Sequence, residues 1–201
     1  MDTEQKSIAF FDFDGTITTK DSFLEMIRWV KGERSFLLGF ALLMPWILAM
    51  KLKIISKADA KQKVLKFFFG GEKIQDFQND CDGFAREKLP SLIRPKAVSQ
   101  IAEHLQNRVT IVVVTASPGN YVEPWSTQNS LFCIATRLEV KEGLITGKID
   151  GRNCNGPEKV NRIKEQFDLS SYATIYAYGD SGGDKQMLQL AHFPSYKPFR
   201  D

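Results

Sequence analysis

Residues 8–16, with the sequence IAFFDFDGT, decide the fold. A short apolar run that ends in carboxylates predicts a buried strand of a parallel sheet, where continuous apolar runs replace alternation. In an extended strand, residues two apart point the same way, so Asp12 and Asp14 are expected to face one pocket at the strand end. Gly15 allows a tight turn that brings backbone N–H groups close to an anion.

Three more apolar runs predict strands, at Val109–Thr115, Phe132–Leu138 and Thr174–Tyr178. Four stretches with helical patterns lie between or after these runs, at Lys96–Gln106, Tyr121–Asn129, Pro157–Phe167 and Asp184–Ala191. This order predicts an α/β fold, with a parallel sheet covered by helices on both faces. Polar residues follow several of the predicted strands at their carboxyl ends, which is where open α/β sheets bind ligands.

The chain between residues 19 and 89 has no strand-like run bounded by turns, and much of it has a helical period. We therefore expect a small helical cap, residues 19–89, inserted after the first strand. The catalytic core would then consist of residues 1–18 and 90–201. A β-hairpin is predicted at Glu139–Lys148, EVKEGLITGK, because glycine lies at its centre and apolar residues alternate on the return.

The composition indicates some functions and excludes others. Of the 201 residues, 43% are hydrophobic and 25% are charged, and the formal net charge is +3. This weakly basic balance suits an anionic substrate or a membrane surface and is too weak to indicate nucleic acid. Three widely spaced cysteines without Cys-x-x-Cys predict neither a disulfide framework nor a zinc site. The first residues, MDTEQ, lack the layout of a signal peptide, so we expect a cytoplasmic protein.

The paired aspartates indicate a metal site. Two carboxylates at a buried strand end are costly without a cation between them, and Mg²⁺ fits a set of oxygen donors with no cysteine or histidine nearby. Considered alone, Asp12 and Asp14 have a simpler interpretation as a solvated turn after a strand. A second acidic cluster, Asp180 and Asp184 in GDSGGD, follows the last predicted strand and would complete an oxygen-only cation pocket.

Two further features suit a bound phosphate. Thr115 ends a predicted strand and is followed by a loop of small residues that begins at Ala116, so a hydroxyl and loop N–H groups can hold a phosphate oxygen. Lys159 lies in the first turn of a predicted helix, where acidic residues are usual, and a shared anion would explain it. The alternatives are that Thr115 is an ordinary strand residue before a helix cap and that Lys159 is a solvated surface lysine.

Taken in order, DFDGT at residues 12–16, Thr115, Lys159 and GDSGGD at residues 179–184 resemble the motifs of the haloacid dehalogenase superfamily of aspartyl-nucleophile phosphatases. The motifs span nearly the whole chain. The resemblance implies a Rossmann-like core. A helical cap between the first two motifs is similar to that of the phosphoserine-phosphatase-like branch, subfamily IB.

The same resemblance implies Mg²⁺-dependent hydrolysis of a phosphomonoester through an aspartyl-phosphate. Asp12 would be the nucleophile, and Asp14 would be the acid to the leaving group and then the base to water. The metal would be held by the Asp12 carboxylate, the Asp14 backbone carbonyl and Asp180, with Asp184 supporting the site. The phosphate-binding residues would be Thr16, Thr115, Ala116 and Lys159.

Features of the cap bear on the substrate. In phosphoserine enzymes of this branch, a glutamate of the early cap contacts the substrate amine; Asp21 takes that place here, and its shorter side chain argues against phosphoserine. Residues 36–50, FLLGFALLMPWILAM, carry no charge and are flanked by basic residues. A helix of this length covers roughly 22 Å, less than the ~30 Å hydrocarbon core, so it should not span a bilayer. It either packs within the cap or dips into a membrane to meet a lipid phosphate.

Several hypotheses about the substrate are compatible with these residues. DGTITTKDS at residues 14–22 and Gly156–Val160, with the apolar cap, are similar to a subgroup that includes type C phosphatidylglycerophosphate phosphatases. A lipid phosphate is therefore the first substrate expected, with peripheral membrane contact through residues 36–50, and a small soluble phosphate is the second. Transfer of the phosphoryl group to an alcohol shares every motif with hydrolysis and stays open, and a non-catalytic phosphate-binding or membrane-docking module is the remaining alternative.

Overall fold

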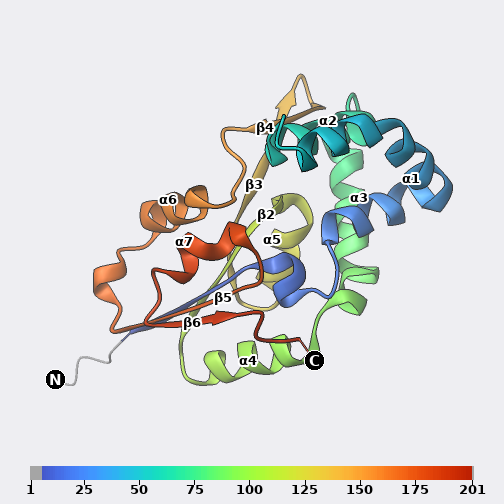
Figure 1. Ribbon diagram of the computed structural model, residues 1–201. Helices are drawn as coiled ribbons and strands as arrows, with labels where there is room; N and C mark the ends of the chain where they lie inside the picture. Colours follow the sequence, from blue (N-terminus) through green and yellow to red (C-terminus); the bar gives the residue numbers. More distant parts are fainter. Residues whose placement is uncertain (1–5, 201) are drawn as a thin grey trace.

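Strand β1 (Ser7–Phe11) lies at the centre of a six-stranded sheet with the order β4-β3-β2-β1-β5-β6 (Figure 1). The computed structural model describes residues 6–200; residues 1–5, including the start of the expected core and the MDTEQ segment, and residue 201 lie outside the described residues. β1 pairs in parallel with β2 (Thr110–Pro118) on one side and with β5 (Thr174–Gly179) on the other. The carboxyl ends of these three strands therefore meet at one edge.

The outer strands complete a mostly parallel sheet. β3 (Phe132–Lys141) runs parallel to β2, and β6 (Phe193–Tyr196) runs parallel to β5. β4 (Leu144–Asp150) is the one antiparallel strand of the described sheet and forms a hairpin with β3. The expected α/β class is confirmed.

Both faces of the sheet are covered, which explains the continuous apolar run in β1. Ala9 and Phe11 belong to one buried cluster, whereas Ile8 and Phe10 belong to a second cluster on the opposite face. Helices α4 and α5 contribute side chains to the first cluster, and α6 and α7 contribute to the second. These helices are α4 (Pro95–Gln106), α5 (Gly119–Gln128), α6 (Pro157–Gln166) and α7 (Lys185–Leu188).

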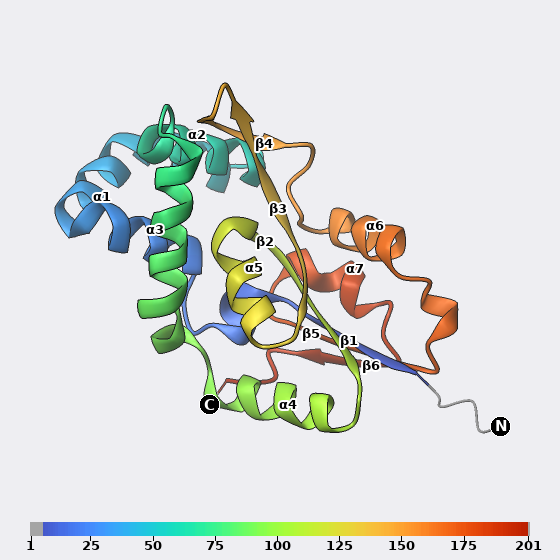
Figure 2. The same ribbon diagram turned by 180° about the vertical axis from the view of Figure 1, so that it is seen from behind.

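Three helices follow β1 and lie beyond one end of the sheet (Figures 1 and 2). They are α1 (Ser22–Lys51), α2 (Lys57–Phe69) and α3 (Ile74–Glu87), and we call them the cap helices. α1 is kinked at Gly32, whose φ of 78° and ψ of 159° are not helical. A 3-10 turn at Leu89–Leu92 leads back to the core.

The β3–β4 hairpin reaches the cap helices, a connection that the sequence did not predict. Ile145 accepts a hydrogen bond from the N–H of Gly71 and donates one to the carbonyl of Glu72, both at 2.8 Å. Gly147 has a φ of 81°, and a Cβ there would lie 2.3 Å from Cα of Lys66, so glycine permits the close approach to α2.

Two other elements differ from the sequence-based expectation. The helix expected at Asp184–Ala191 is limited to the 3-10 turn Gly182–Asp184 followed by the single-turn α7. β6 was not predicted, since its sequence FPSY contains a proline, and proline is tolerated only where the ladder needs no N–H donor, as on an edge strand.

Phe11 provides a test of the core. Its ring stacks on Tyr178 with centroids 4.3 Å apart, and it is fully buried. We expect Phe11→Ala to lower the free energy of unfolding by about 3–5 kcal/mol, because the cavity it leaves cannot close fully. Phe132→Ala, at a ring that is 58% exposed, should change the free energy by less than ~1 kcal/mol. Urea denaturation followed by circular dichroism measures both, and equal losses would contradict this assignment of the core.

Candidate active site

Asp12 lies immediately after β1, where the strand meets β5. Its backbone N–H donates to the carbonyl of Tyr178 at 2.9 Å, so the β1–β5 pairing continues to the start of the loop. The residue is only 7% exposed. A tight turn over Phe13–Ile17 follows, in which Thr16 donates a hydrogen bond from Oγ1 to Asp12 Oδ2 at 3.0 Å. The alternative of a solvated turn is therefore wrong, because the carboxylate is buried and held.

Gly15 brings the first loop against the loop after β5. Its φ is 80°, and a Cβ at this position would lie 2.4 Å from Oδ2 of Asp180. A side chain here would displace the aspartate, so the glycine of DFDGT permits two acidic loops to touch. This is a packing role in addition to the turn.

Three carboxylates converge at the carboxyl ends of β1 and β5. Asp12, Asp180 and Asp184 each place one oxygen atom within 4.8 Å of the others. An all-oxygen set of this size suits a hard divalent cation such as Mg²⁺. Asp14 is not part of this cluster, but it lines the same cavity as Asp12, as the strand spacing predicted.

Lys159 lies between two of these acids. Its Nζ donates to Asp12 Oδ1 at 2.5 Å and to Asp184 Oδ1 at 2.7 Å, and the residue is 1% exposed. Gly156, with a φ of 61°, precedes α6 and donates its N–H to the carbonyl of Gly183 at 2.9 Å, which places the first turn of α6 against the acidic loop. The alternative of a solvated surface lysine is wrong.

Burial and charge shift the titration of this cluster in opposite directions. Burial raises the pKa of Asp12 to about 7 despite the Lys159 ammonium, and the Asp184 and Asp14 carboxylates add to the rise. Burial also acts to raise the pKa of Asp184, but Lys159 and hydrogen bonds from Ser181 hold it below its usual value. For Lys159, burial acts to lower the pKa, and the two carboxylates outweigh it, so the pKa lies above its usual range. The excess of negative charge favours a bound cation.

Asp14 is held by hydroxyl groups from both the cap and the core. Its Oδ1 accepts from the N–H of Ser22 at 2.6 Å and from Ser22 Oγ at 2.5 Å, and its Oδ2 accepts from Ser117 Oγ at 2.5 Å. Ser22 Oγ in turn lies 3.0 Å from the Tyr121 hydroxyl. The sequence motifs did not indicate the two serine partners of Asp14, although Ser117 stands only two positions after Thr115.

The last residues of β2 face the same site through Ala116 and Ser117; the strand was expected to end at Thr115 and continues to Pro118. Thr115 is fully buried, and its Oγ1 accepts a hydrogen bond from the N–H of Ser117 at 2.9 Å. The carbonyl of Ala116 accepts from Lys61 Nζ of α2 at 2.7 Å. This end of β2 is thus fixed by the Thr115–Ser117 hydrogen bond and by Lys61 of α2.

A cavity of about 440 Å³ extends from Asp12, Asp180 and Asp184 to the cap helices. Its inner wall contains the acidic cluster and Lys159, and Asp21 also lines it while capping α1 through a hydrogen bond from the N–H of Leu24 to Oδ1 at 3.0 Å. Its outer wall is apolar and includes Phe40, Ile47 and Met50 of α1. A ligand in it would have a polar end at Asp12 and an apolar end at the cap.

The family model described as "haloacid dehalogenase-like hydrolase" matches residues 9–189, which include every residue of this cluster. The chain belongs to the haloacid dehalogenase-like hydrolases. The Rossmann-like fold of that family, expected from the motifs, is confirmed.

Relatives and solved structures agree with this membership. The hydrolase is 37% identical over 196 residues to Protein CicA of Caulobacter vibrioides, a match that covers 96% of this chain and 86% of CicA. It resembles a Bordetella pertussis Tohama I protein of unknown function with a TM-score of 0.81 at 20% identity, over 96% and 89% of the two chains. A phosphoserine phosphatase solved as a phospho-aspartyl intermediate analogue matches with a TM-score of 0.61 at 19% identity, over 93% and 84%. At these identities the two structures show the shared fold.

Two cationic residues of the hydrolase were not expected near the site. Lys61 lines the cavity, and burial lowers its pKa although Asp14 and Asp21 oppose the change. Arg200, from the segment after β6, donates from Nη2 to Asp180 Oδ2 at 2.5 Å. A lysine on an amphipathic helix and an arginine near the chain end are usually solvated, so no sequence signal indicates these long-range contacts.

Gly15→Ala tests the contact between the two acidic loops of the hydrolase. The added Cβ would displace Asp180, so we expect a loss of folding stability together with weaker stabilisation by added Mg²⁺. Gly143→Ala is the matched control, because Gly143 also has a positive φ, of 76°, and a Cβ there would meet no atom within 4 Å. The control should cost about 1–2 kcal/mol from backbone strain alone and keep the full Mg²⁺ response. Thermal unfolding with and without Mg²⁺ measures both, and identical Mg²⁺ responses would contradict the role of Gly15.

Proposed function

We propose that this hydrolase is a Mg²⁺-dependent phosphomonoesterase that forms an aspartyl-phosphate on Asp12. The observation that carries the proposal is the buried Asp12 carboxylate, bound by Lys159 and adjacent to Asp180 and Asp184 at the carboxyl ends of parallel strands. The phosphoserine phosphatase whose structure represents a phospho-aspartyl intermediate shares the fold, which supports the same chemistry here.

The donor set supports magnesium as the cofactor. The ligands we propose are the carboxylates of Asp12 and Asp180 and the backbone carbonyl of Asp14, with Asp184 as a supporting acid. When bound, Mg²⁺ supplies positive charge that offsets the repulsion between a carboxylate and a phosphate dianion, a repulsion of ~4 kcal/mol for unit charges 4 Å apart at an effective dielectric of about 20.

In the first step, a carboxylate oxygen of Asp12 attacks phosphorus, and the bond from phosphorus to the leaving-group oxygen breaks. Asp14, in its protonated form, gives its proton to that oxygen, and the alcohol departs. The hydrogen bonds from Ser22 and Ser117 orient the Asp14 carboxyl group for this transfer. Lys159 stays positively charged beside the attacking group, because its two carboxylate partners raise its pKa.

In the second step, Asp14, now a carboxylate, takes a proton from water as the water oxygen attacks phosphorus. The bond between phosphorus and Asp12 breaks, which releases phosphate and restores the free carboxylate of Asp12. Division of hydrolysis into two transfers leaves each step to depend mainly on alignment and charge compensation. We assign the holding of the phosphoryl oxygens to Thr16, Thr115, the Ala116 loop and Lys159.

We propose that residues 19–89 form the cap and that residues 1–18 and 90–201 form the catalytic core. The two chain segments that connect the cap to the core, near Thr19 and near Leu92, lie side by side. The N–H of Thr19 donates to the carbonyl of Leu92, and the N–H of Arg94 donates to the carbonyl of Ile17, both at 2.8 Å. Because the cap contributes Asp21, Phe23 and Lys61 to the cavity, it would select the leaving group.

For the substrate, we propose a lipid phosphate such as phosphatidylglycerophosphate. The apolar outer wall of the cavity, with Phe40, Ile47 and Met50, supports this choice, since a small polar phosphate would leave it without a partner. The proposal includes a cytoplasmic location with peripheral membrane contact through residues 36–50. A small soluble phosphate is the alternative, and a screen of phosphorylated metabolites beside short-chain lipid phosphates would decide between them.

Asp12→Asn tests the nucleophile. An amide oxygen is a poor nucleophile toward phosphorus, so kcat for p-nitrophenyl phosphate should fall on the order of 10³-fold or more. Asp76→Asn, at an exposed acid of α3, should keep the parent rate. Mass spectrometry after acid quench should find a phosphoryl group on the peptide that contains Asp12 in the parent and none in the variant. A variant with the parent's rate would refute the assignment.

Ser117→Ala tests the orientation of Asp14. Loss of a hydrogen bond to a charged group costs about 1.5–3 kcal/mol, so kcat for an alkyl phosphate should fall by roughly 10- to 100-fold. The fall should be smaller for p-nitrophenyl phosphate, whose leaving group needs little help from an acid. Ser117→Thr should restore much of the rate, and Ser99→Ala, at an exposed hydroxyl of α4, serves as the control. Equal losses for both substrates would show that Ser117 does not act through the acid.

A further inference from the structure

The second half of α1 and the turn after it expose large apolar side chains to solvent. Leu37, Leu38, Leu42, Trp46, Leu52 and Ile54 are between 43% and 71% exposed, and we call these six residues the apolar surface. Single exposed leucines are ordinary, but Leu38, Leu42 and Trp46 are four residues apart and share one face of α1, and a group of this kind marks an interaction site. Nothing in the proposed reaction uses these side chains.

The helix that carries most of the apolar surface packs against α2. Within the described residues, α1 is the one helix long and apolar enough to cross a membrane by length and composition, with 17% of its most apolar window buried. Its opposite face is occupied, since Phe36 and Leu43 are buried, and a Cβ at Gly39 would lie 2.3 Å from the Phe68 ring of α2. Insertion across a bilayer would break this packing, so an interfacial position suits the helix better.

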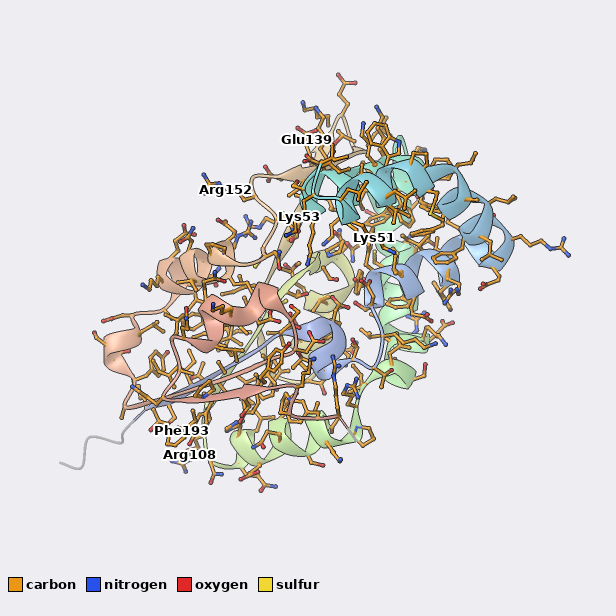
Figure 3. The ribbon with its side chains drawn as sticks, viewed as in Figure 1. Lys51, Lys53, Arg108, Glu139, Arg152 and Phe193 are labelled. Carbon is orange, nitrogen blue, oxygen red and sulfur yellow. The ribbon has the colours of Figure 1, made fainter. Side chains whose placement is uncertain are left out.

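The charges around the apolar surface favour an anionic partner. Residues 34–58 contain no aspartate or glutamate and include four basic residues, Arg34 and the lysines at 51, 53 and 57. Two of these, Lys51 and Lys53, lie between the cap helices and the core in the view of Figure 3. Lys63 of α2 places Nζ 4.5 Å from the centroid of the Trp46 ring, so a cation also borders the surface there. Two copies joined through this surface would bring like charges together, which opposes a dimer.

The apolar surface continues into the wall of the cavity. Phe40, Ile47 and Met50 belong to the same helical segment and line the cavity that ends at Asp12. One side of the segment therefore faces solvent, and another faces the site. The acyl part of a phosphorylated lipid would meet apolar side chains of α1, and its phosphate would meet the polar inner wall.

We propose that the apolar surface docks on an anionic lipid bilayer, with its leucines and Trp46 in the interfacial region and the neighbouring lysines on lipid phosphates. The use of a membrane-embedded substrate rests on the proposed phosphatase activity. The docking itself does not, because it depends only on exposed side chains outside the catalytic cluster.

Vesicle sedimentation with the full chain tests the apolar contribution. The parent should bind vesicles of phosphatidylcholine and phosphatidylglycerol in equal parts and bind phosphatidylcholine vesicles weakly. The double variant Leu38→Ser and Leu42→Ser should lose at least about tenfold in the partition coefficient, because two leucines no longer leave water. Leu105→Ser, at a leucine of α4 that is 40% exposed, is the matched control and should bind like the parent. Circular dichroism verifies that each variant is folded.

Charge variants test the second contribution. Lys51→Gln and Lys53→Gln should each lower binding to the anionic vesicles about fivefold, and added salt should have the same effect on the parent. Lys148→Gln and Lys164→Gln, at exposed lysines of the core, are the controls.

Four outcomes would overturn the proposal: no binding of the parent to anionic vesicles, equal binding to neutral vesicles, loss of binding in the Leu105→Ser control, or a dimer in light scattering that Leu38→Ser and Leu42→Ser dissolve. The last would make the apolar surface an interface between two copies. Hydrolysis of p-nitrophenyl phosphate should be unchanged in the leucine variants. Vesicle binding by a parent that hydrolyses no phosphomonoester would refute the proposed function and leave the docking surface intact.

Discussion

The ion network around Lys159 is the constraint on which the site depends. Asp12 and Asp184 are almost completely buried, and two carboxylates so close together would repel each other strongly without a cation between them. The ammonium group satisfies one oxygen of each acid and leaves the other oxygens to Thr16 and to the Ser181 loop. Arg200 pairs with Asp180, so the three carboxylates of the cluster face two cationic side chains, and the remaining negative charge favours a bound cation.

The sheet brings these groups together from distant parts of the chain. β1 lies between β2 and β5, and all three run in the same direction. The residues at their carboxyl ends, Asp12, Thr115 and Asp180, must therefore gather at one edge, although as many as 168 positions separate the first from the last. The pairing also explains why the core around Phe11 lies directly beneath the site, where rigid packing limits the movement of the acids.

Much of this arrangement can be predicted from the sequence, because it follows from local patterns. A buried strand has a continuous apolar run, a glycine marks the turn, and the carboxyl ends of parallel strands share an edge, so the order of residues alone is enough to group Asp12, Asp180 and Asp184. The prediction that Asp12 acts as the nucleophile, that Mg²⁺ binds and that residues 19–89 form the cap remains a proposal. The local pattern also identified residues 36–50 as an apolar helix, but it did not predict which side of this helix packs against the rest of the protein.

The features that were missed depend on contacts between elements far apart in sequence. Ser22 and Ser117 approach Asp14 from two different elements, and Arg200 reaches Asp180 from beyond β6. Serine and arginine are common on protein surfaces, so their presence in the sequence does not indicate contacts with the acids of the site. The short β6 was missed because its proline and serine are unusual in strands. The edge position of β6 tolerates the proline, since an edge strand has backbone groups that need no partner.

The attachment of the β3–β4 hairpin to the turn between α2 and α3 has a mechanical consequence. The cap is fastened at its base by the paired crossings near Thr19 and Leu92 and at its far side by backbone hydrogen bonds to Ile145. Because the cap helices are attached at two separate places, they cannot rotate about one attachment without breaking the hydrogen bonds of the other. Movement of the cap helices away from the sheet would therefore cost the backbone hydrogen bonds of Ile145 and the close packing of Gly147 on α2.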